Sequence, residues 1–264
     1  MNYKFSILVF CNLLMTINLV GQASIIKLNN ASFEDEFPRH SRIVDGWYDC
    51  GAMNFPEESA PDIHPSPNPL EAFSVIKVPY DGDTYIGMVV RDNDSWESIA
   101  QRLTKPLEKN SCYTFSLELA RSRFYQSRSR ITGLPENYAQ PIIVRIWGGN
   151  GYCNRKERLA ESRLVTNYDW ENFNFKFEPK QKITHIIIEA FYKTPVLFPY
   201  NGNVLIDNAS DIMLIPCDEE SPAAKAERPA VKFTRPGGGS IIVEEGKYTV
   251  KAKIYNVEER KDIR

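Results

Sequence analysis

The sequence has few of the residue patterns that catalysis and metal binding require. Three histidines occur among 264 residues, and none has the spacing of a metal-binding pair: they are His40, His64 and His185. There is no Gly-x-Ser-x-Gly elbow and no phosphate-binding loop. The formal net charge is -2, which gives no indication of a nucleic-acid partner. With no assembled nucleophile or activated water, the protein is predicted not to be an enzyme.

Long hydrophobic runs are also missing, except at the N-terminus. Lys4 precedes an apolar run from Phe5 to Val20, and small residues, ending in Ala23, follow it. This pattern predicts a secretory signal peptide over residues 1–23, cleaved after Ala23. A membrane anchor is the alternative, but polar residues interrupt the run. No later segment could span a bilayer, so the mature chain is expected to be extracellular or associated with the cell surface or outer membrane.

Four cysteines remain after removal of the signal peptide. An even number in an exported chain permits two disulfides with three alternative pairings. No two are near neighbours, which is unlike a zinc site. Buried free thiols are the competing interpretation. The four residues are Cys50, Cys112, Cys153 and Cys217.

The remaining pattern is that of an all-β protein. Residues 35–82 are rich in proline and predict a long irregular connection, which would form a lid on the core through its apolar members Trp47, Tyr48, Met53 and Phe55. From Thr84 onward, short strands recur between turn signals, as in a β-sandwich. We expect strands at about 84–90, 96–104, 111–122, 141–148, 157–165, 170–178, 184–192 and 203–216.

Alternation along these strands sorts their faces. Phe115, Leu117 and Leu119 share an apolar face, as do Ile186 and Ile188. If the strands adjoin, the other face of one sheet carries Glu118, Arg145, Trp147, Asn172, Asn174 and Glu189. If successive strands run antiparallel, four loops rich in aromatic and arginine residues emerge at one end, where a sandwich often carries recognition: 91–95, 123–140, 166–169 and 193–202.

The composition changes after Cys217. Residues 218–240 contain three prolines and three consecutive glycines and read as a linker. Residues 241–264 alternate like two strands of a second β-unit. Two strands are not stable alone in water, so this short tail is either a hairpin docked on the first domain or the start of an incomplete domain.

Several motifs carry a family resemblance. Asn30–Glu34, Trp96–Leu103, Cys112–Ser116 and Leu205–Ser210 resemble the galactose-binding-like jelly rolls of carbohydrate-binding modules. Arg145–Asn150, together with Glu189 to Tyr192, is similar to a subgroup found in bacterial secreted and cell-surface proteins. The likeness covers residues 24–217. It implies a jelly-roll β-sandwich that is usually non-enzymatic and holds one structural calcium where its first and last strands meet.

The resemblance places the calcium ligands at Glu34 and Asp207, with carbonyl groups near Asn30 and Ser32 as further ligands. Calcium takes six to eight oxygen ligands, which carboxylates and carbonyls supply. The alternative is that Glu34 and Asp207 cap turns by hydrogen bonds.

Two functions remain open. The first is a carbohydrate-binding module, with sugar held by the sheet-face residues Trp147, Arg145, Glu118 and Glu189 or by the loop-end residues Tyr125, Tyr138 and Tyr200. The second is a structural or adhesive module of a cell-envelope protein that contacts another surface protein. A glycosidase would need two carboxyl groups beside one bond, and Glu118 with Glu189 are the candidates. An ion network with Arg145 is the alternative role of these acids.

Overall fold

The computed structural model describes residues 25–35, 43–56, 58, 60–70 and 72–218, together with the strand backbones 231–234, 240–244 and 247–251. The chain divides into two compact units, Met1–Glu219 and Glu220–Arg264. The predicted signal peptide lies outside the described residues.

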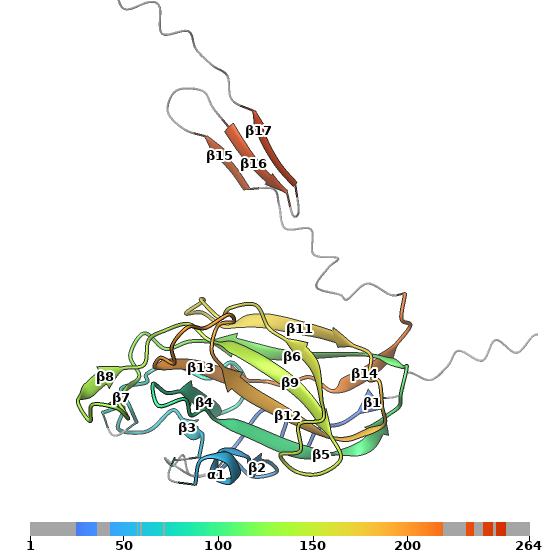
Figure 1. Cartoon of the computed structure of the whole chain (residues 1–264), viewed down its shortest axis with the longest axis horizontal. Coiled ribbons are helices and arrows are strands. Elements are labelled where there is room, and N and C mark those ends of the chain that lie inside the picture. The colour runs from blue at the N-terminus through green and yellow to red at the C-terminus, as the bar shows by residue number, and fades with distance from the viewer. Residues whose placement is uncertain are drawn as a thin grey trace, which may run out of the picture. The chain divides into compact units, whose positions relative to one another are not determined.

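Two antiparallel sheets form the first unit (Figure 1). One sheet has seven strands, in the order β1 (Ile25–Ile26), β14 (Ile212–Ile215), β6 (Cys112–Ala120), β13 (Gly202–Asp207), β4 (Tyr85–Val90) and β3 (Asp62–His64), with β11 (Glu171–Phe177) paired to β6. The other has five, in the order β10 (Glu157–Glu161), β9 (Ile143–Gly149), β12 (Ile183–Phe191), β5 (Ser98–Leu107) and β2 (Tyr48–Asp49).

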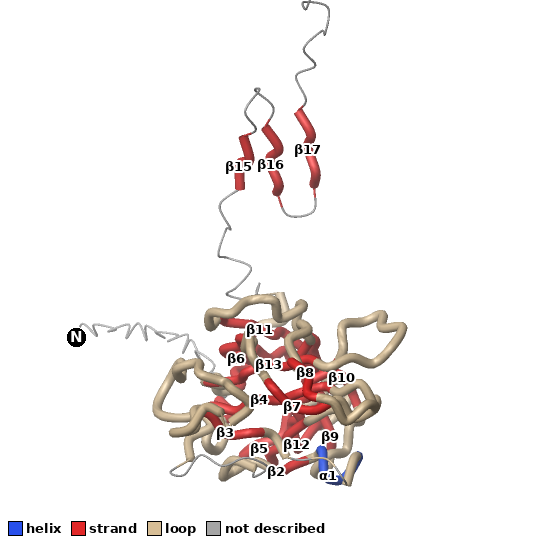
Figure 2. The backbone as a smooth tube through the Cα atoms, turned by 90° about the vertical axis from the view of Figure 1, so that its left-hand side faces the viewer, coloured by secondary structure: helices blue, strands red, loops and turns tan. Residues whose placement is uncertain are grey.

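The chain crosses repeatedly between the two layers. β4, β6, β11 and β13 belong to the seven-stranded sheet, and β5, β9 and β12, which come between them in sequence, belong to the five-stranded sheet. Figure 2 shows the sheets lying face to face. This alternation gives the jelly-roll sandwich that the sequence predicted, and all eight expected strand regions contain strands.

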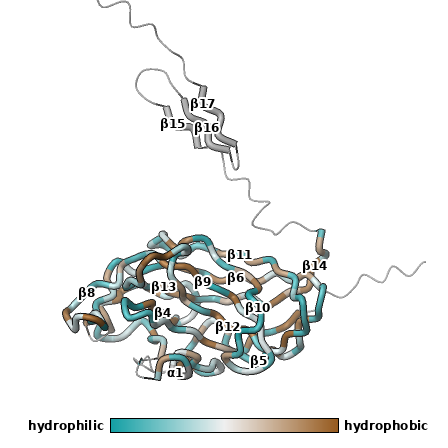
Figure 3. Tube along the Cα trace, in the orientation of Figure 1, coloured by the Kyte–Doolittle hydropathy of each residue, from teal (hydrophilic) through white to brown (hydrophobic). Residues whose placement is uncertain are grey.

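Side chains from the two inner faces make one continuous core. Phe115, Leu117 and Leu119 of β6 meet Ile186 and Ile188 of β12 in the same buried cluster. The predicted alternation is therefore confirmed for these strands, since every second residue faces inward. Hydrophobic and hydrophilic colours accordingly alternate along the strands in Figure 3.

The predicted single outer face is wrong. Glu118 and Asn172 are cross-strand neighbours in the seven-stranded sheet, whereas Arg145 and Glu189 are neighbours in the five-stranded sheet. Alternation assigns residues to faces but contains no information on which strands adjoin. Because both groups point away from the core, they lie on opposite outer faces of the sandwich.

The two ends of the domain lie side by side, as predicted. β1 pairs with β14, with Ile26 opposite Ile212. The backbone N–H of Ala209 donates a hydrogen bond of 2.9 Å to the carbonyl of Ala31. The polar break between β13 and β14 therefore closes the fold against the turn that follows β1.

The 35–82 segment has more regular structure than its proline content predicted. Its described part contains β2, the four-residue helix α1 (Gly51–Asn54) and β3. The lid role holds for Trp47, which stacks on Phe33 at 5.2 Å between ring centroids, and for Phe55, which packs edge-on against Trp96 at 5.0 Å. Tyr48 is exposed instead.

Hydrogen bonds tie the four predicted loops together at one end. Asn201 joins the 193–202 loop to both Asp92 and Glu136. Arg121 links the 166–169 loop to the 123–140 loop, because it donates to the hydroxyl of Tyr168 at 2.6 Å and to the carbonyl of Ala139. The expected clustering is confirmed, and the 123–140 loop also contains a hairpin that the sequence analysis missed, β7 (Gln126–Arg128) with β8 (Pro135–Asn137).

The second unit contains a three-stranded antiparallel sheet. Its strands are β15 (Val231–Thr234), β16 (Ser240–Glu244) and β17 (Lys247–Lys251). The prediction of two strands missed β15, which lies inside the range predicted as linker.

The four cysteines form two disulfides, Cys50–Cys153 and Cys112–Cys217, which settles the three alternative pairings. The second joins the start of β6 to the residues after β14 and spans 105 residues of sequence. Cross-links that close long loops restrict the unfolded chain strongly. This bridge therefore stabilises the same closure that β14 makes by pairing with β6.

The paired substitution Cys112→Ser and Cys217→Ser is expected to lower the free energy of unfolding by about 2–5 kcal/mol, because the unfolded chain regains the freedom of that long loop. Urea unfolding monitored by tryptophan fluorescence measures the loss. Non-reducing peptide mapping of the variant should still recover the Cys50–Cys153 pair. An unchanged unfolding midpoint would contradict a stabilising role for the bridge.

Candidate functional site

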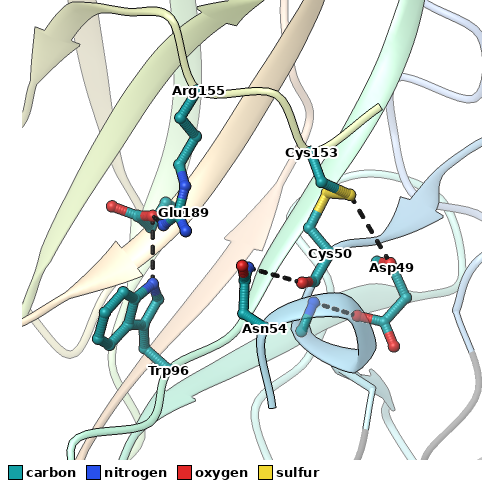
Figure 4. The surroundings of a disulfide bond; sticks show 8 residues. Asp49, Cys50, Asn54, Trp96, Cys153, Arg155 and Glu189 are labelled. Atoms are coloured by element: carbon teal, nitrogen blue, oxygen red, sulfur yellow. Dashed lines mark hydrogen bonds and ion pairs between the residues drawn. A yellow bond between two sulfur atoms is a disulfide. The ribbon is translucent and has the colours of Figure 1, made fainter. Parts of the chain in front are cut away.

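Glu189 is the centre of a polar network on the outer face of the five-stranded sheet. Its two carboxylate oxygens accept hydrogen bonds from the indole N–H groups of Trp147, at 2.9 Å, and Trp96, at 3.1 Å. Arg155 forms an ion pair with it, and Arg145 lies 4.0 Å away. Figure 4 shows Trp96 and Arg155 reaching Glu189 beside the Cys50–Cys153 disulfide. Only 1% of Glu189 is exposed.

Arg145 is occupied by the same network. Its Nε donates to Glu161 at 2.9 Å, and its guanidinium lies 3.6 Å from the centroid of the Phe191 ring. A buried carboxylate with this many donors is stabilised in its place and has little capacity left for a ligand. Glu189 and Arg145 thus form the ion network that was the alternative role for this acid.

Glu118 is apart from this network. It lies on the outer face of the seven-stranded sheet, where Asn172 donates a hydrogen bond of 2.7 Å to it. Both sheets separate Glu118 from Glu189, so the two acids cannot flank one glycosidic bond. The residues predicted as one sheet-face site are therefore two separate groups.

An exposed pair of tyrosines lies over the five-stranded sheet. Tyr48 is 43% exposed and Tyr152 is 48% exposed. Their ring centroids are 4.8 Å apart with an angle of 29° between the planes. The edge-to-face contact of Tyr152 with His185, also 4.8 Å, places the pair over β12. We call Tyr48 and Tyr152 the tyrosine platform.

The disulfide explains why these tyrosines meet. Tyr48 lies two residues before Cys50, and Tyr152 immediately precedes Cys153. The bridge joins the start of the lid to the loop after β9 and brings the rings together. The sequence offers a signal for the platform, since each tyrosine lies within two residues of a cysteine, but the signal cannot be used until the cysteine pairing is known.

Charge and polarity beside the platform come from the underlying strands. Arg102 of β5 is opposite His185 of β12 and is exposed. Burial lowers the pKa of His185, and the positive charge of Arg102 lowers it further. The imidazole of His185 is therefore neutral near pH 7 and adds no charge beside the tyrosine rings.

The three predicted loop-end tyrosines lie at that end of the domain, but their rings are not available for stacking on a sugar. Tyr125 and Tyr138 are each 1% exposed, and Tyr200 is half-buried. Their hydroxyls bond to Asp62, to the carbonyl of Arg128 and to the carbonyl of Pro141 respectively. Burial raises the pKa of all three phenols. These residues hold the loops together.

Arg91 anchors the same end from within. It is 2% exposed and pairs with both Glu97 and Glu58, whose contact with the Arg91 Nε is 3.2 Å. Burial raises the pKa of Glu97, and the charge of Arg91 opposes this shift. Such a buried network makes the loop end rigid.

Glu34 and Asp207 meet where the first and last strands join. Asp207 accepts backbone N–H groups from Tyr80, at 2.7 Å, Asp81, at 3.1 Å, and Asn208, at 2.7 Å. Burial raises the pKa of Asp207 to about 6, and the negative charge of Glu34 contributes to this shift. These hydrogen bonds are the turn-capping role that the sequence analysis left open.

One feature of this site also fits a cation. Glu34 Oε2 accepts from the backbone N–H groups of Asp83 and Thr84, but Oε1 is buried without a hydrogen-bond partner. A side chain at Gly82, whose φ is +60°, would place its Cβ 2.0 Å from that oxygen. Elsewhere in the described residues, Glu178 lies in a compact group of potential metal ligands with Cys112 and Cys217. The sulfurs of these two cysteines are bonded to each other in a disulfide.

No protein-family model and no curated protein matches the sequence. Among solved structures, the chain is similar to the CBM22-1 xylan-binding domain of Paenibacillus barcinonensis Xyn10C, with 14% identity, a TM-score of 0.42 and coverage of 73% of this chain and 96% of that one. A family 16 carbohydrate-binding module has 13% identity, a TM-score of 0.37 and coverage of 72% and 99%.

A third similar structure is the K3 cleaved adhesin domain of Lys-gingipain from Porphyromonas gingivalis, with 10% identity, a TM-score of 0.36 and coverage of 74% of this chain and 99% of that one. Carbohydrate-binding modules are thus among the structures that this chain resembles, as its motifs predicted. At these identities and TM-scores the similarity carries no information about a ligand.

Replacing Glu189 by alanine is expected to lower the free energy of unfolding by about 3–5 kcal/mol, because it removes the buried acceptor on which the surrounding arginine and indole groups converge. The matched control is Glu171→Ala, whose ion pair with Arg163 is about half exposed and should contribute less than about 1 kcal/mol. Denaturant unfolding compares the two variants. Equal losses would contradict the central role of Glu189.

Proposed function

We propose that the sandwich domain is a non-catalytic carbohydrate-binding module of an exported protein and that the tyrosine platform holds the sugar. The observation that carries this proposal is the exposure of two stacked aromatic rings on a sheet whose other aromatic residues are packed. Exposed aromatic faces stack on the apolar faces of sugar rings, and adjacent polar groups bind the hydroxyls. Arg102 supplies a donor on the neighbouring strand.

Preorganisation supports this role. The Cys50–Cys153 disulfide joins the backbones that carry Tyr48 and Tyr152, and the buried Glu189 network supports the sheet beneath them. A rigid platform loses little conformational entropy on binding. Trp147 is half-buried and donates its N–H to Glu189, so we assign it a supporting position at the edge of the platform.

Export is supported by the cysteine chemistry. Two disulfides in one domain are typical of proteins that fold in an oxidising compartment, in agreement with the predicted signal peptide. Across the described residues, no helix is long and apolar enough to cross a membrane. The cell surface or the extracellular space is our proposed location.

The loop end favours a second candidate, an adhesive module that binds another protein. Large hydrophobic side chains gather there in exposed positions: Phe124, Ile131, Leu134, Leu197 and Phe198. Figure 3 shows hydrophobic colour at the tip of the β7–β8 hairpin. Exposed apolar groups beside polar ones are typical of protein-binding surfaces.

We also propose a structural calcium at Glu34 and Asp207. Two acidic residues lie where the turn after β1 meets the end of β13, and one has a carboxylate oxygen that lacks a partner. This arrangement favours a cation that neutralises both charges. A calcium ion there would tie the turn after β1 to the kink between β13 and β14.

Alanine at Tyr48 or Tyr152 is expected to weaken glycan binding about tenfold or more, since the loss of one stacking ring removes on the order of 1.5 kcal/mol. A glycan array identifies the sugar, and calorimetry with that sugar gives the affinities. Tyr80→Ala is the control, because Tyr80 is equally exposed but lies beside Asp207, away from the platform. Equal binding by all variants would exclude the platform. An empty array together with retained binding to a surface protein would favour the adhesive alternative.

Saturating calcium is expected to raise the free energy of unfolding, by about 2.7 kcal/mol at a hundredfold excess over Kd, and EDTA should reverse the effect. Glu34→Gln should remove the calcium dependence, whereas Glu171→Gln should leave it unchanged. Differential scanning calorimetry measures the melting temperature, and elemental analysis measures the bound calcium. A melting temperature insensitive to chelation, with no calcium detected, would remove the site.

A further inference from the structure

A groove of about 510 Å³ lies at the loop end, outside the tyrosine platform. Three segments that are far apart in sequence build it: residues 76–77 before β4, residues 121–124 after β6, and residues 167–171 at the start of β11. Lys77, Arg121 and Arg123 supply three positive charges to its lining.

These cations are held by neutral groups. Arg121 donates to the carbonyls of Thr166 and Ala139 and to the hydroxyl of Tyr168. Lys77 donates to the carbonyl of Tyr168 at 2.6 Å. In the part of the chain that the structure describes, no carboxylate forms an ion pair with Lys77, Arg121 or Arg123.

Tyr168 is the common support of the three charges. The Arg121 and Arg123 guanidinium carbons lie 4.3 and 4.0 Å from the centroid of its ring. Cation–π contacts stabilise a cation without neutralising it. Gathering three like charges in one groove costs electrostatic free energy, which a bound anion recovers.

The two acidic residues of the lining, Asp169 and Glu171, offset only part of this charge. Glu171 pairs with Arg163, which is not part of the lining. The pKa of Lys77 is lowered by burial, and the negative charge of Asp169 opposes this shift. The lining retains an excess of positive charge, although the whole chain has a formal net charge of -2.

An apolar ring completes the groove. Phe124 lies in the lining and is exposed. A sugar ring can pack its C–H face on this phenyl group, while arginine binds a planar carboxylate through two parallel hydrogen bonds. The combination suits an acidic sugar better than a free inorganic anion, which has no apolar face.

We propose that this groove is a second binding site of the domain and that it takes an anionic sugar residue, with Arg123 and Lys77 contacting the negative group. The anionic group is a uronic-acid carboxylate or a sulfate ester. The site shares no residue with the tyrosine platform, so it is independent of the function proposed there.

The test uses three polymers with related backbones: a galacturonan oligomer, a sulfated galactan and a neutral galactan. Isothermal titration calorimetry with the sandwich-containing full chain should detect binding to one or both acidic polymers, weakened by added salt, and none to the neutral one at this site. Tighter binding to the galacturonan identifies the carboxylate as the recognised group. Tighter binding to the sulfated galactan identifies the ester.

Arg123→Gln and Lys77→Gln should each lower the affinity for the acidic polymer about tenfold or more, because each variant loses one charge-assisted contact. Arg128→Gln is the matched control, because Arg128 is exposed at the same end but donates to the carbonyl of Gly133 outside the groove. Circular dichroism verifies folding. Tyr152→Ala should retain acidic binding even if it loses neutral sugars.

The proposal is overturned by any of four results. They are no binding to either acidic polymer, equal binding of all three polymers by Tyr152→Ala, an equal loss in Arg128→Gln, and a loss in Tyr152→Ala as large as that in Arg123→Gln. The third would indicate a diffuse charge effect and the fourth would assign the acidic sugar to the platform.

Discussion

β6 is hydrogen-bonded along one edge to two successive segments of the chain, β13 and β14. Leu205 of β13 lies opposite Ala120, and Met213 of β14 lies opposite Thr114. The kink between the two strands makes this double pairing possible, and Asp207 holds the kink by accepting three backbone N–H groups. Since β1 pairs with β14 and the Cys112–Cys217 bridge ties its end to β6, the closure of the sandwich depends on this one edge.

Closure leaves two outer faces and one loop end on which function can reside. On the five-stranded sheet, the Glu189 network and the Cys50–Cys153 bridge use the charged residues for support and leave two tyrosines exposed. At the loop end, buried Arg91 and the tyrosine hydroxyls make a rigid base, and the lining of a groove carries more positive than negative side chains. In both places the buried polar groups are structural, and the candidate ligand contacts are their exposed neighbours.

Burial decides which residues of a promising type can act in recognition. Glu189, Arg145, Tyr125 and Tyr138 have the chemistry of a sugar site, but each is buried and fully engaged with protein partners. Tyr48 was expected to be a lid residue and no role was predicted for Tyr152, whereas the structure stacks the two rings in exposed positions beside the Cys50–Cys153 disulfide. Residue type alone could not separate these two groups, because partners come from distant segments.

The sequence by itself determined the class of fold, the strand regions of the sandwich and the inward faces of β6 and β12. These features follow from local signals: period-two alternation, turn residues and proline positions. Only the tertiary structure decided the strand neighbours, the cysteine pairing and the burial of each candidate side chain. Those depend on contacts between residues some 100 positions apart, such as Cys50 with Cys153, and no local pattern encodes which distant partner a segment will meet.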